Sequence, residues 1–314
     1  MNNSSQSPGG YGSIMGVPEF ENYEFELNWI FFVVLAMMVY STIPIYIYWK
    51  TVLIFFLKKG KIKQSGIRVE ILYSFLLMQF WNIVLVFADF AMFRIGYTTI
   101  LTKYCASENP QVLLRTITFT YFWAVYCSQL FTVLFCSLSV GVLCSCSAKK
   151  TCKIIKIVPP IIVIFGFIAA FPQLTTDSYC MKLMEPMLPE SILIISKFHA
   201  GNLPVIAFNF FVYLSVTIII AALNLIMMIR IRRSRNSISA RFALQHAKIE
   251  KTLTGTMMIL LFPMILNLLI TIGEILHSWY FSYILFARPF VLDARVHIVT
   301  CYFYYTHPIF KKAK

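Results

Sequence analysis

Charged residues are scarce in this 314-residue sequence, where they make up 13% of the chain. Soluble domains usually carry about 25% charged residues, and the mean hydropathy here is +0.75. Acidic residues are the scarcest, with 13 Asp and Glu against 27 Lys and Arg. This composition excludes an ordinary soluble domain. The net charge of +14 does not predict a nucleic-acid partner, because the basic residues stand in short runs between apolar segments.

Motifs for catalysis and metal binding are also absent. The five histidines are scattered, with no His-Glu-x-x-His and no clustered metal-ligand spacing, and no glycine-rich nucleotide loop occurs. We therefore predict no enzyme, no cofactor and no metal site. The first 28 residues hold no Lys or Arg, so the basic start of a cleavable signal peptide is missing. The first apolar segment is expected to act as its own insertion signal.

Long uncharged runs are what the sequence has instead. Trp29 to Trp49 is 21 residues without a charge, Thr116 to Ala148 is 33, and Phe198 to Ile229 is 32. Since a helix of ~20 apolar residues crosses a bilayer, we predict an all-α membrane protein. The predicted crossings are roughly 29–57, 70–94, 113–146, 154–174, 199–230, 252–275 and 286–308.

The seventh segment is the weakest, because Arg288, Asp293 and Arg295 interrupt it. If only six segments cross, both chain ends lie on one side. The distribution of basic residues decides between the two counts. With seven crossings, 19 of the 27 Lys and Arg residues fall on one side, as expected for the cytoplasmic side.

The sequence therefore predicts a seven-transmembrane helix bundle with its N-terminus outside and its C-terminus in the cytoplasm. Its parts are an extracellular tail (1–28), the membrane domain (29–310) and a cytoplasmic tail (311–314). Asn2 and Asn3 each begin a glycosylation acceptor sequence in the outer tail.

Two of the eight cysteines fall on the predicted outer side. Cys105 precedes the third segment, and Cys180 lies between the fourth and fifth. The outer face belongs to an oxidising compartment, so we predict a disulfide that fixes the second outer loop to the top of the third helix. The alternative is two unpaired thiols.

A few ionisable residues fall within apolar segments, where they are costly and are candidates for function. Asp89 lies ~30 Å along the second helix, close enough to its outer end for Arg94 to reach it. Asp293 and His297 are four residues apart and share one helix face, so they can pair; Arg295 points elsewhere. Asp89, Asp293 and His297 either contact a ligand directly or form a network that holds the outer helix ends together.

Aromatic residues make one face of the outer half of the third segment. Phe119, Phe122, Trp123 and Tyr126 recur at helical spacing. This face either lines an apolar pocket for a small hydrophobic molecule or packs against neighbouring helices.

The largest basic cluster follows the fifth segment. It contains Arg230, Arg232, Arg233 and Arg235. These residues either attract anionic lipids of the inner leaflet or dock a cytoplasmic partner.

Five short blocks are spread over almost the whole length of the sequence. They are Pro18–Tyr23, Ala88–Phe90 with Arg94, Cys105–Pro110, Arg288–Phe290 with Asp293, and Thr306–Lys312. In this order they resemble one family, the nematode serpentine chemoreceptors of class U, which are seven-helix receptors of the G-protein-coupled type. The resemblance implies a receptor that binds an environmental small molecule outside and activates a heterotrimeric G protein. It also implies a plasma-membrane location, in the cilia of sensory neurons.

The chain departs from related sequences at two places. No Arg occurs near Val140, at the inner end of the third segment, and Thr300-Cys301 replaces the Pro-Trp that relatives tend to have. Two alternatives to a coupled receptor therefore stay open: a ligand-gated channel or transporter, and a membrane scaffold that does not signal. The chain shows no paired halves of the kind that transporters often have.

Overall fold

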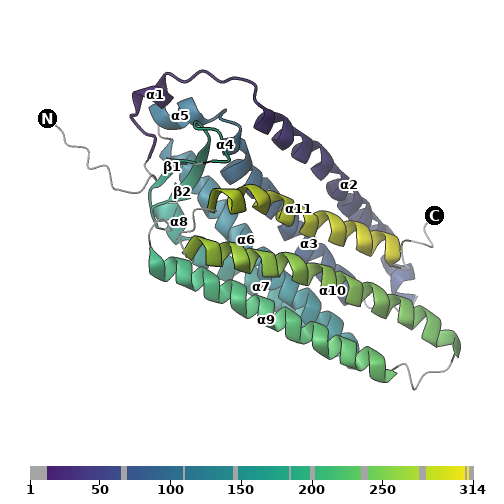
Figure 1. Cartoon of the computed structure of the whole chain (residues 1–314). Coiled ribbons are helices and arrows are strands. Elements are labelled where there is room, and N and C mark those ends of the chain that lie inside the picture. The colour runs from purple at the N-terminus through teal and green to yellow at the C-terminus, as the bar shows by residue number, and fades with distance from the viewer. Residues whose placement is uncertain are drawn as a thin grey trace.

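The chain folds into a bundle of long helices (Figure 1). The computed structural model describes residues 13–64, 69–108, 110–143, 148–183, 185–198, 202–234, 240–275, 281–307 and 310. Seven long helices occur in this part of the chain. They are α2 (Trp29–Gln64), α3 (Val69–Asp89), α6 (Gln111–Leu143), α7 (Ala148–Ala170), α9 (Leu203–Ser234), α10 (Ala240–Ile275) and α11 (Phe281–Thr306).

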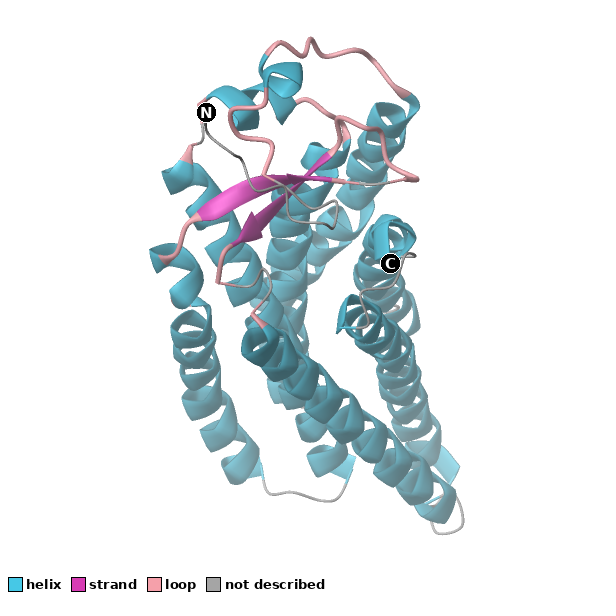
Figure 2. Cartoon of the chain, turned by 60° about the vertical axis from the view of Figure 1, so that its left-hand side comes forward, coloured by secondary structure: helices cyan, strands magenta, loops and turns pink. Residues whose placement is uncertain are grey.

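Short elements gather at one end of this bundle (Figure 2). Two of them form an antiparallel hairpin in which Cys180 pairs with Ile194, so the prediction of an all-α protein is wrong in this loop. The residues 192–196 are mostly β-branched and largely buried, which suits a strand. The short elements are α1 (Pro18–Glu21), the π-helical turn η1 (Phe90–Arg94), α4 (Ile95–Tyr97), α5 (Thr102–Ser107), α8 (Pro172–Thr175), β1 (Ser178–Lys182) and β2 (Ile192–Ser196).

The hairpin is fixed to its surroundings at two points. Cys105 of α5 and Cys180 of β1, for which the sequence predicts a disulfide, are joined in one, with Cα atoms 6.1 Å apart. Gly96 of α4 lies against β2, and a Cβ at this position would stand 2.5 Å from the carbonyl oxygen of Ile192. Only glycine lets the second helix approach the hairpin this closely.

Part of the predicted outer tail is packed against the same hairpin. Ser13 forms a β-bridge with Met181, and the N–H of Ile14 donates to the carbonyl oxygen of Cys180 at 3.1 Å. The side chain of Ile14 is 1% exposed. The described residues from 13 onwards are therefore packed onto the bundle before the first long helix begins at Trp29.

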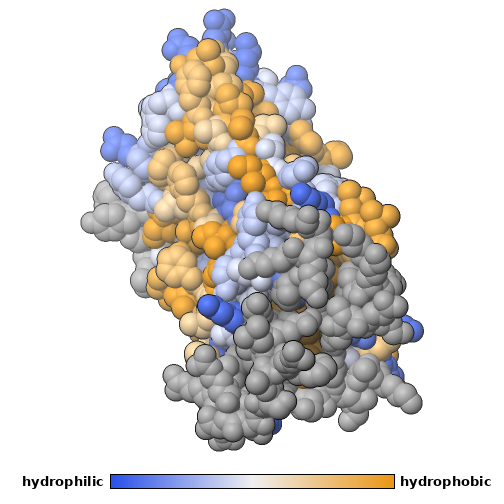
Figure 3. All heavy atoms as spheres, turned by 90° about the vertical axis from the view of Figure 1, so that its right-hand side faces the viewer, coloured by the Kyte–Doolittle hydropathy of each residue, from blue (hydrophilic) through white to orange (hydrophobic). Residues whose placement is uncertain are grey.

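The helices bury different shares of their surfaces. The apolar stretches of α3 and α6 are mostly inside the bundle, whereas those of α2, α7 and α9 are mostly outside it. Large apolar side chains face outward on these three helices, among them Phe56, Ile168 and Phe211. Figure 3 shows hydrophobic side chains across the flanks of the described surface. Soluble proteins rarely expose so much contiguous apolar surface, so these faces are the ones that contact lipid.

Five of the described helices are long and apolar enough to cross a membrane: α2, α3 with its extension, α6, α7 with α8, and α9. In α10 a shorter apolar stretch, Lys251–Leu266, stands out. The charged residues of α11 lower its hydropathy, which is also why the seventh predicted segment is the weakest. The chain is thus a helical membrane protein.

The helix bounds differ from the predicted segments where polar residues extend a helix beyond its apolar run. α10 begins at Ala240, twelve residues before the predicted start at 252, and α2 continues to Gln64 instead of ending near 57. Apolar runs of bilayer length predict only the apolar part of such helices, so their polar ends were not predicted. In the opposite sense, α7 ends at Ala170 because Pro172 begins the separate turn α8.

Candidate functional site

Four ionised side chains lie close together between α2, α3 and α11, below the hairpin. They are Asp89, Arg94, Arg288 and Asp293. Asp89 and Arg94 form the central pair: both side chains are 0% exposed, and Arg94 Nε lies 2.8 Å from Asp89 Oδ2. In an α-helix, residues five apart lie about 140° apart around the axis. The π-helical turn η1 brings them onto one side of the helix. The local distortion after Asp89 therefore makes this ion pair possible.

The same guanidinium connects the second helix to the last one. Arg94 Nη1 and Nη2 donate to Asp293 Oδ2 and Oδ1 at 2.8 and 2.7 Å. This bidentate arrangement is the strongest geometry for a guanidinium and a carboxylate. The hydroxyl of Tyr40 on α2 also donates to the carboxylate of Asp293. Three helices are thus joined through one buried carboxylate.

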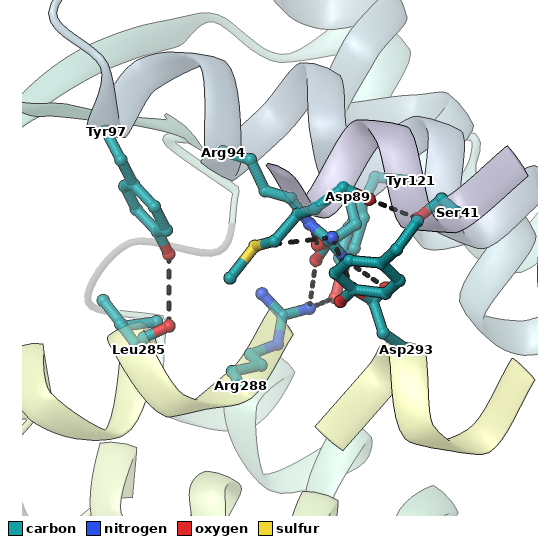
Figure 4. A network of polar contacts seen from close by, with 10 residues as sticks. Ser41, Asp89, Arg94, Tyr97, Tyr121, Leu285, Arg288 and Asp293 are labelled. Atoms are coloured by element: carbon teal, nitrogen blue, oxygen red, sulfur yellow. Dashed lines mark hydrogen bonds and ion pairs between the residues drawn. The ribbon is translucent and has the colours of Figure 1, made fainter. Parts of the chain in front are cut away.

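Arg288 completes the group from α11 (Figure 4). Its Nη2 lies 3.5 Å from Asp89 Oδ1 and donates to the hydroxyl of Tyr121 on α6. Its guanidinium also stacks over the ring of Phe93, 4.1 Å from the ring centroid. The two guanidiniums and two carboxylates balance in charge, which is what allows the group to be buried. The side chain of Arg288 is the most exposed of the four, at 13%.

His297 connects α11 to α2 through the backbone. Pro44 lies inside α2 and has no N–H for the carbonyl of Tyr40, four residues earlier. His297 Nε2 lies 3.2 Å from this carbonyl oxygen. A carbonyl only accepts, so the tautomer with its proton on Nε2 donates to Tyr40, and the tautomer with its proton on Nδ1 donates to the backbone oxygen of Asp293 instead. In the Nε2–H tautomer the histidine replaces the hydrogen bond that the proline removes.

Three of the predicted ligand-contact residues, Asp89, Asp293 and His297, therefore come together. The expected pairing of the two side chains on α11 is wrong, however. His297 Nδ1 contacts the backbone oxygen of Asp293 at 2.8 Å, because Arg94 and Tyr40 occupy the carboxylate. Tyr40 and Arg288 were not among the predicted site residues. A charged residue inside an apolar segment was a usable signal for Arg288, whereas nothing in the sequence singled out Tyr40.

A second polar cluster lies deeper in the bundle, on the other face of α11. Arg295, two residues after Asp293, is 1% exposed, and its Nη2 donates to Thr132 Oγ1 at 2.5 Å and to the carbonyl oxygen of Ser128 at 3.2 Å. Ser128 in turn donates to Asn82 Oδ1 on α3 at 2.6 Å. As expected, Arg295 points away from Asp293.

The predicted aromatic face of α6 divides between two neighbouring helices. Phe119 and Trp123 both pack edge-on against Phe167 of α7, with ring centroids 5.3 and 5.6 Å apart. Tyr126 instead donates to Asn209 Oδ1 of α9 at 2.7 Å, and Phe122 is 7% exposed. Packing against α7 thus accounts for Phe119 and Trp123, as the second of the two sequence interpretations expects.

The remaining predicted site residues are the arginines that follow the fifth segment and the two glycosylation acceptors. Arg230 is exposed near the C-terminal end of α9, and the backbone of Arg232 and Arg233 continues that helix. Arg235, Asn2 and Asn3 lie outside the described residues. Among the described residues, no group of three or more His, Cys, Asp or Glu side chains could hold a metal ion.

Comparison with known families agrees with this architecture. The family model described as serpentine type 7TM GPCR chemoreceptor Sru matches residues 14–313. No curated protein gives a significant match. The match spans nearly the whole chain, including the N-terminal segment that packs against the hairpin and the charged residues of α3 and α11. The chain belongs to the Sru family of serpentine seven-transmembrane chemoreceptors.

Proposed function

We propose that this protein is a chemosensory receptor of the plasma membrane. It binds a small molecule from outside in the outer half of the bundle and signals to a heterotrimeric G protein at the inner end. Seven helices cross the membrane in this proposal, with the hairpin outside. Family membership supports the receptor class. The disulfide at the hairpin end supports the orientation, since disulfides persist in oxidising compartments.

The observation that carries the proposal is the buried ionic group below the hairpin. Arg94 joins α3 to α11 through Asp293, and Tyr40 adds α2. The relative positions of three helices thus depend on one set of charges. Arg288 has the longest contact in the group, 3.5 Å to Asp89, and is its most exposed member. A polar ligand group that competes for Arg288 changes the balance between helix arrangements.

Signalling then follows as a shift of population. A ligand moves the equilibrium between two arrangements only by its difference in affinity for them. The inner ends of α9 and α10 extend beyond their apolar stretches and are the proposed moving parts. The basic residues there, from Arg230 to Arg235, are the proposed contact for the G protein.

Two measurements on intact cells test this proposal. An epitope tag placed before Met1 is expected to bind antibody without permeabilisation, whereas a tag after Lys314 is not. A library of small organic molecules, screened with a cyclic-nucleotide and a calcium readout, is expected to yield an agonist. Both tags on the same side would overturn the orientation. A ligand-gated current from the purified protein in liposomes would establish a channel instead.

A matched pair of variants then separates coupling from binding. Neutralising Arg230, Arg232, Arg233 and Arg235 to Gln is expected to leave surface expression and agonist binding intact and to abolish the second-messenger response. The control is Arg115→Gln, which removes a guanidinium at the hairpin end and leaves the inner end unchanged. A full response from the quadruple variant would show that the coupling surface is wrongly assigned.

A further inference from the structure

Arg295 is a buried cation with no described counter-ion. Its guanidinium contacts only neutral groups, a threonine hydroxyl and a backbone carbonyl of α6, among the described residues. Arginine stays charged in proteins. A full positive charge is therefore held in the middle of the bundle, and no described side chain around it carries a compensating charge.

The acidic residues of the helices are too far away or already engaged. Only five of the 13 acidic residues lie in the long helices, and two of these, Asp89 and Asp293, are paired with Arg94 and Arg288. The other three are Glu70, Glu250 and Glu274. Their backbone positions can be compared with that of Arg295 through the packing of the helices.

Each of the three lies well above or below Arg295 along the bundle. Gly273, next to Glu274 on α10, packs against Ile284 of α11. Ile284 is ~16 Å along α11 from Arg295, so Glu274 lies about that far away in one direction. In the other direction, Gly255 of α10 packs against Tyr302, which is ~10 Å along α11 from Arg295, and Glu250 lies five residues beyond Gly255.

The third acid lies on α3. Glu70 is twelve residues before Asn82 on α3, a distance of ~18 Å. Asn82 stands at the same height in the bundle as Arg295, because both contact Ser128. The guanidinium is held in place by α6, and the backbone of each of these three residues stands ~16–18 Å from it along the bundle.

Two buried N–H donors in the cluster around this arginine lack acceptors. Arg295 Nε is buried and has no partner among the described residues. Asn82 Nδ2, which Ser128 connects to this arginine, lies 3.5 Å from Gln79 Oε1, and Gln79 Nε2 is buried and likewise has no partner in the described part of the chain. Gln79 is 0% exposed. Buried donors without acceptors are rare and call for a missing partner.

We infer that Arg295, with Gln79, is a binding site for an anionic group, and that the physiological ligand of this receptor carries a carboxylate that reaches it. A carboxylate accepts from Nε and from a guanidinium N–H at once, supplies the absent negative charge and satisfies the unpartnered donor. This inference rests on the proposed function for the identity of the ligand. The anion site itself does not, because an inorganic anion such as chloride offers the same chemistry.

The test measures binding to the purified protein in lipid nanodiscs and needs no signalling. Thermal unfolding is followed with a series of straight-chain carboxylates from acetate to octanoate, and with the alcohols of matching length. A second arm replaces sulfate by chloride at constant ionic strength. A ligand at about 100 times its Kd raises Tm by several degrees in a chain of this size. The expected result is a rise with carboxylates and no rise with alcohols.

Variants assign the effect to the site. Arg295→Gln is expected to remove the carboxylate-dependent rise, and Arg115→Gln, which removes a guanidinium at the surface, is expected to keep it. Thr132→Val leaves the charge in place and loses one contact of the guanidinium. It serves where Arg295→Gln fails to fold, and a reduced carboxylate effect is then the supporting result. A rise that is identical in all variants would overturn the site.

The two arms also separate the sources of the anion. A rise with chloride alone that depends on Arg295 supports an internal inorganic-anion site and overturns the carboxylate ligand. No rise with any anion overturns the inference altogether. If carboxylates bind and the cell assay finds no signalling, the proposed function fails while the site stands. A neutral agonist that acts equally on Arg295→Gln would instead leave the receptor function intact and refute the carboxylate.

Discussion

The hydroxyl of Tyr97 donates to the carbonyl oxygen of Leu285 at 3.3 Å. This carbonyl is the one that Pro289, inside α11, leaves without its helical N–H. The same arrangement recurs deeper in the bundle, where His297 reaches the carbonyl of Tyr40 that Pro44 frees. In a membrane, an unsatisfied backbone group is costly. Two prolines thus create two acceptors, and side chains of neighbouring helices occupy both.

Tyr97→Phe is expected to lower the free energy of unfolding by about 1–3 kcal/mol, the typical penalty for a buried acceptor left unpaired. In Pro289→Ala the helix regains its own N–H, so the tyrosine hydroxyl becomes dispensable there. The loss caused by Tyr97→Phe should therefore be smaller in the Pro289→Ala background. Thermal unfolding of the four proteins in nanodiscs gives this comparison. Equal losses in both backgrounds would show that the two features are independent.

Asp293→Asn is expected to destabilise the protein by about 3–5 kcal/mol, because it leaves Arg94 buried with one carboxylate in place of two. Replacing both members of the pair, as in Arg94→Met with Asp293→Leu, should cost less than the single change. Asp177→Asn serves as the control, since its ion pairs with Arg115 and Lys197 lie at the surface. Surface expression and Tm are the measurements. A double variant that is less stable than Asp293→Asn would contradict the prediction.

Cys105→Ser and Cys180→Ser are each expected to reduce surface expression strongly. Loss of a native disulfide typically costs about 2–5 kcal/mol, and this one closes a loop of 75 residues that contains α6 and α7. Cys301→Ser, at a partly buried free cysteine, is the control and should traffic normally. Flow cytometry with an N-terminal tag measures the difference. Wild-type surface levels in either disulfide variant would be inconsistent with the assigned role.

The ion pairs of Asp177, which lie outside the membrane-spanning helices, should make the stability of the protein depend on pH. Its hydrogen bonds to Lys197 and Arg115 hold the pKa of its carboxyl below the usual range. A depressed folded-state pKa stabilises the protein above the unfolded pKa of about 3.9, and the effect is lost as the pH falls through the folded value. The Tm difference between wild type and Asp177→Asn should be small and constant above about pH 5, and should vanish in stronger acid. A difference that grows with acidity would contradict this sign.

Gly166 of α7 lies so close to α6 that there is no room for a larger side chain. A Cβ there would stand 2.8 Å from Cys127 Sγ and 3.2 Å from Trp123 Cδ1. Overpacking typically costs about 1–3 kcal/mol, so Gly166→Leu should destabilise more than Gly166→Ala. In a Cys127→Ala background, the loss from Gly166→Ala should shrink because the nearest atom is gone. Tm values of the four alanine-series proteins check this, and an undiminished loss would place the conflict elsewhere.

Much of the architecture was predictable from the sequence, because a bilayer imposes simple rules. The length of an apolar helix is set by the membrane thickness, so the long helices could be located to within a few residues along most of the chain. Polar extensions, such as the first turns of α10, obey no such rule and were missed. The partnership of Cys105 with Cys180 was predictable because only two cysteines fall on one side of the membrane.

The hairpin and the partners of the buried charges were decided by the tertiary structure. That Asp89, Asp293 and Arg288 are costly in an apolar segment is a property of the residues themselves. Which of them meet depends on the π-helical turn that rotates Arg94 onto Asp89 and on the approach of α11 to α3. Asp293 and Arg295 are two positions apart, yet Asp293 forms an ion pair and Arg295 contacts only neutral groups among the described residues. The helix directs the two side chains about 200° apart around its axis. The packing of the neighbouring helices then determines which groups each side chain contacts.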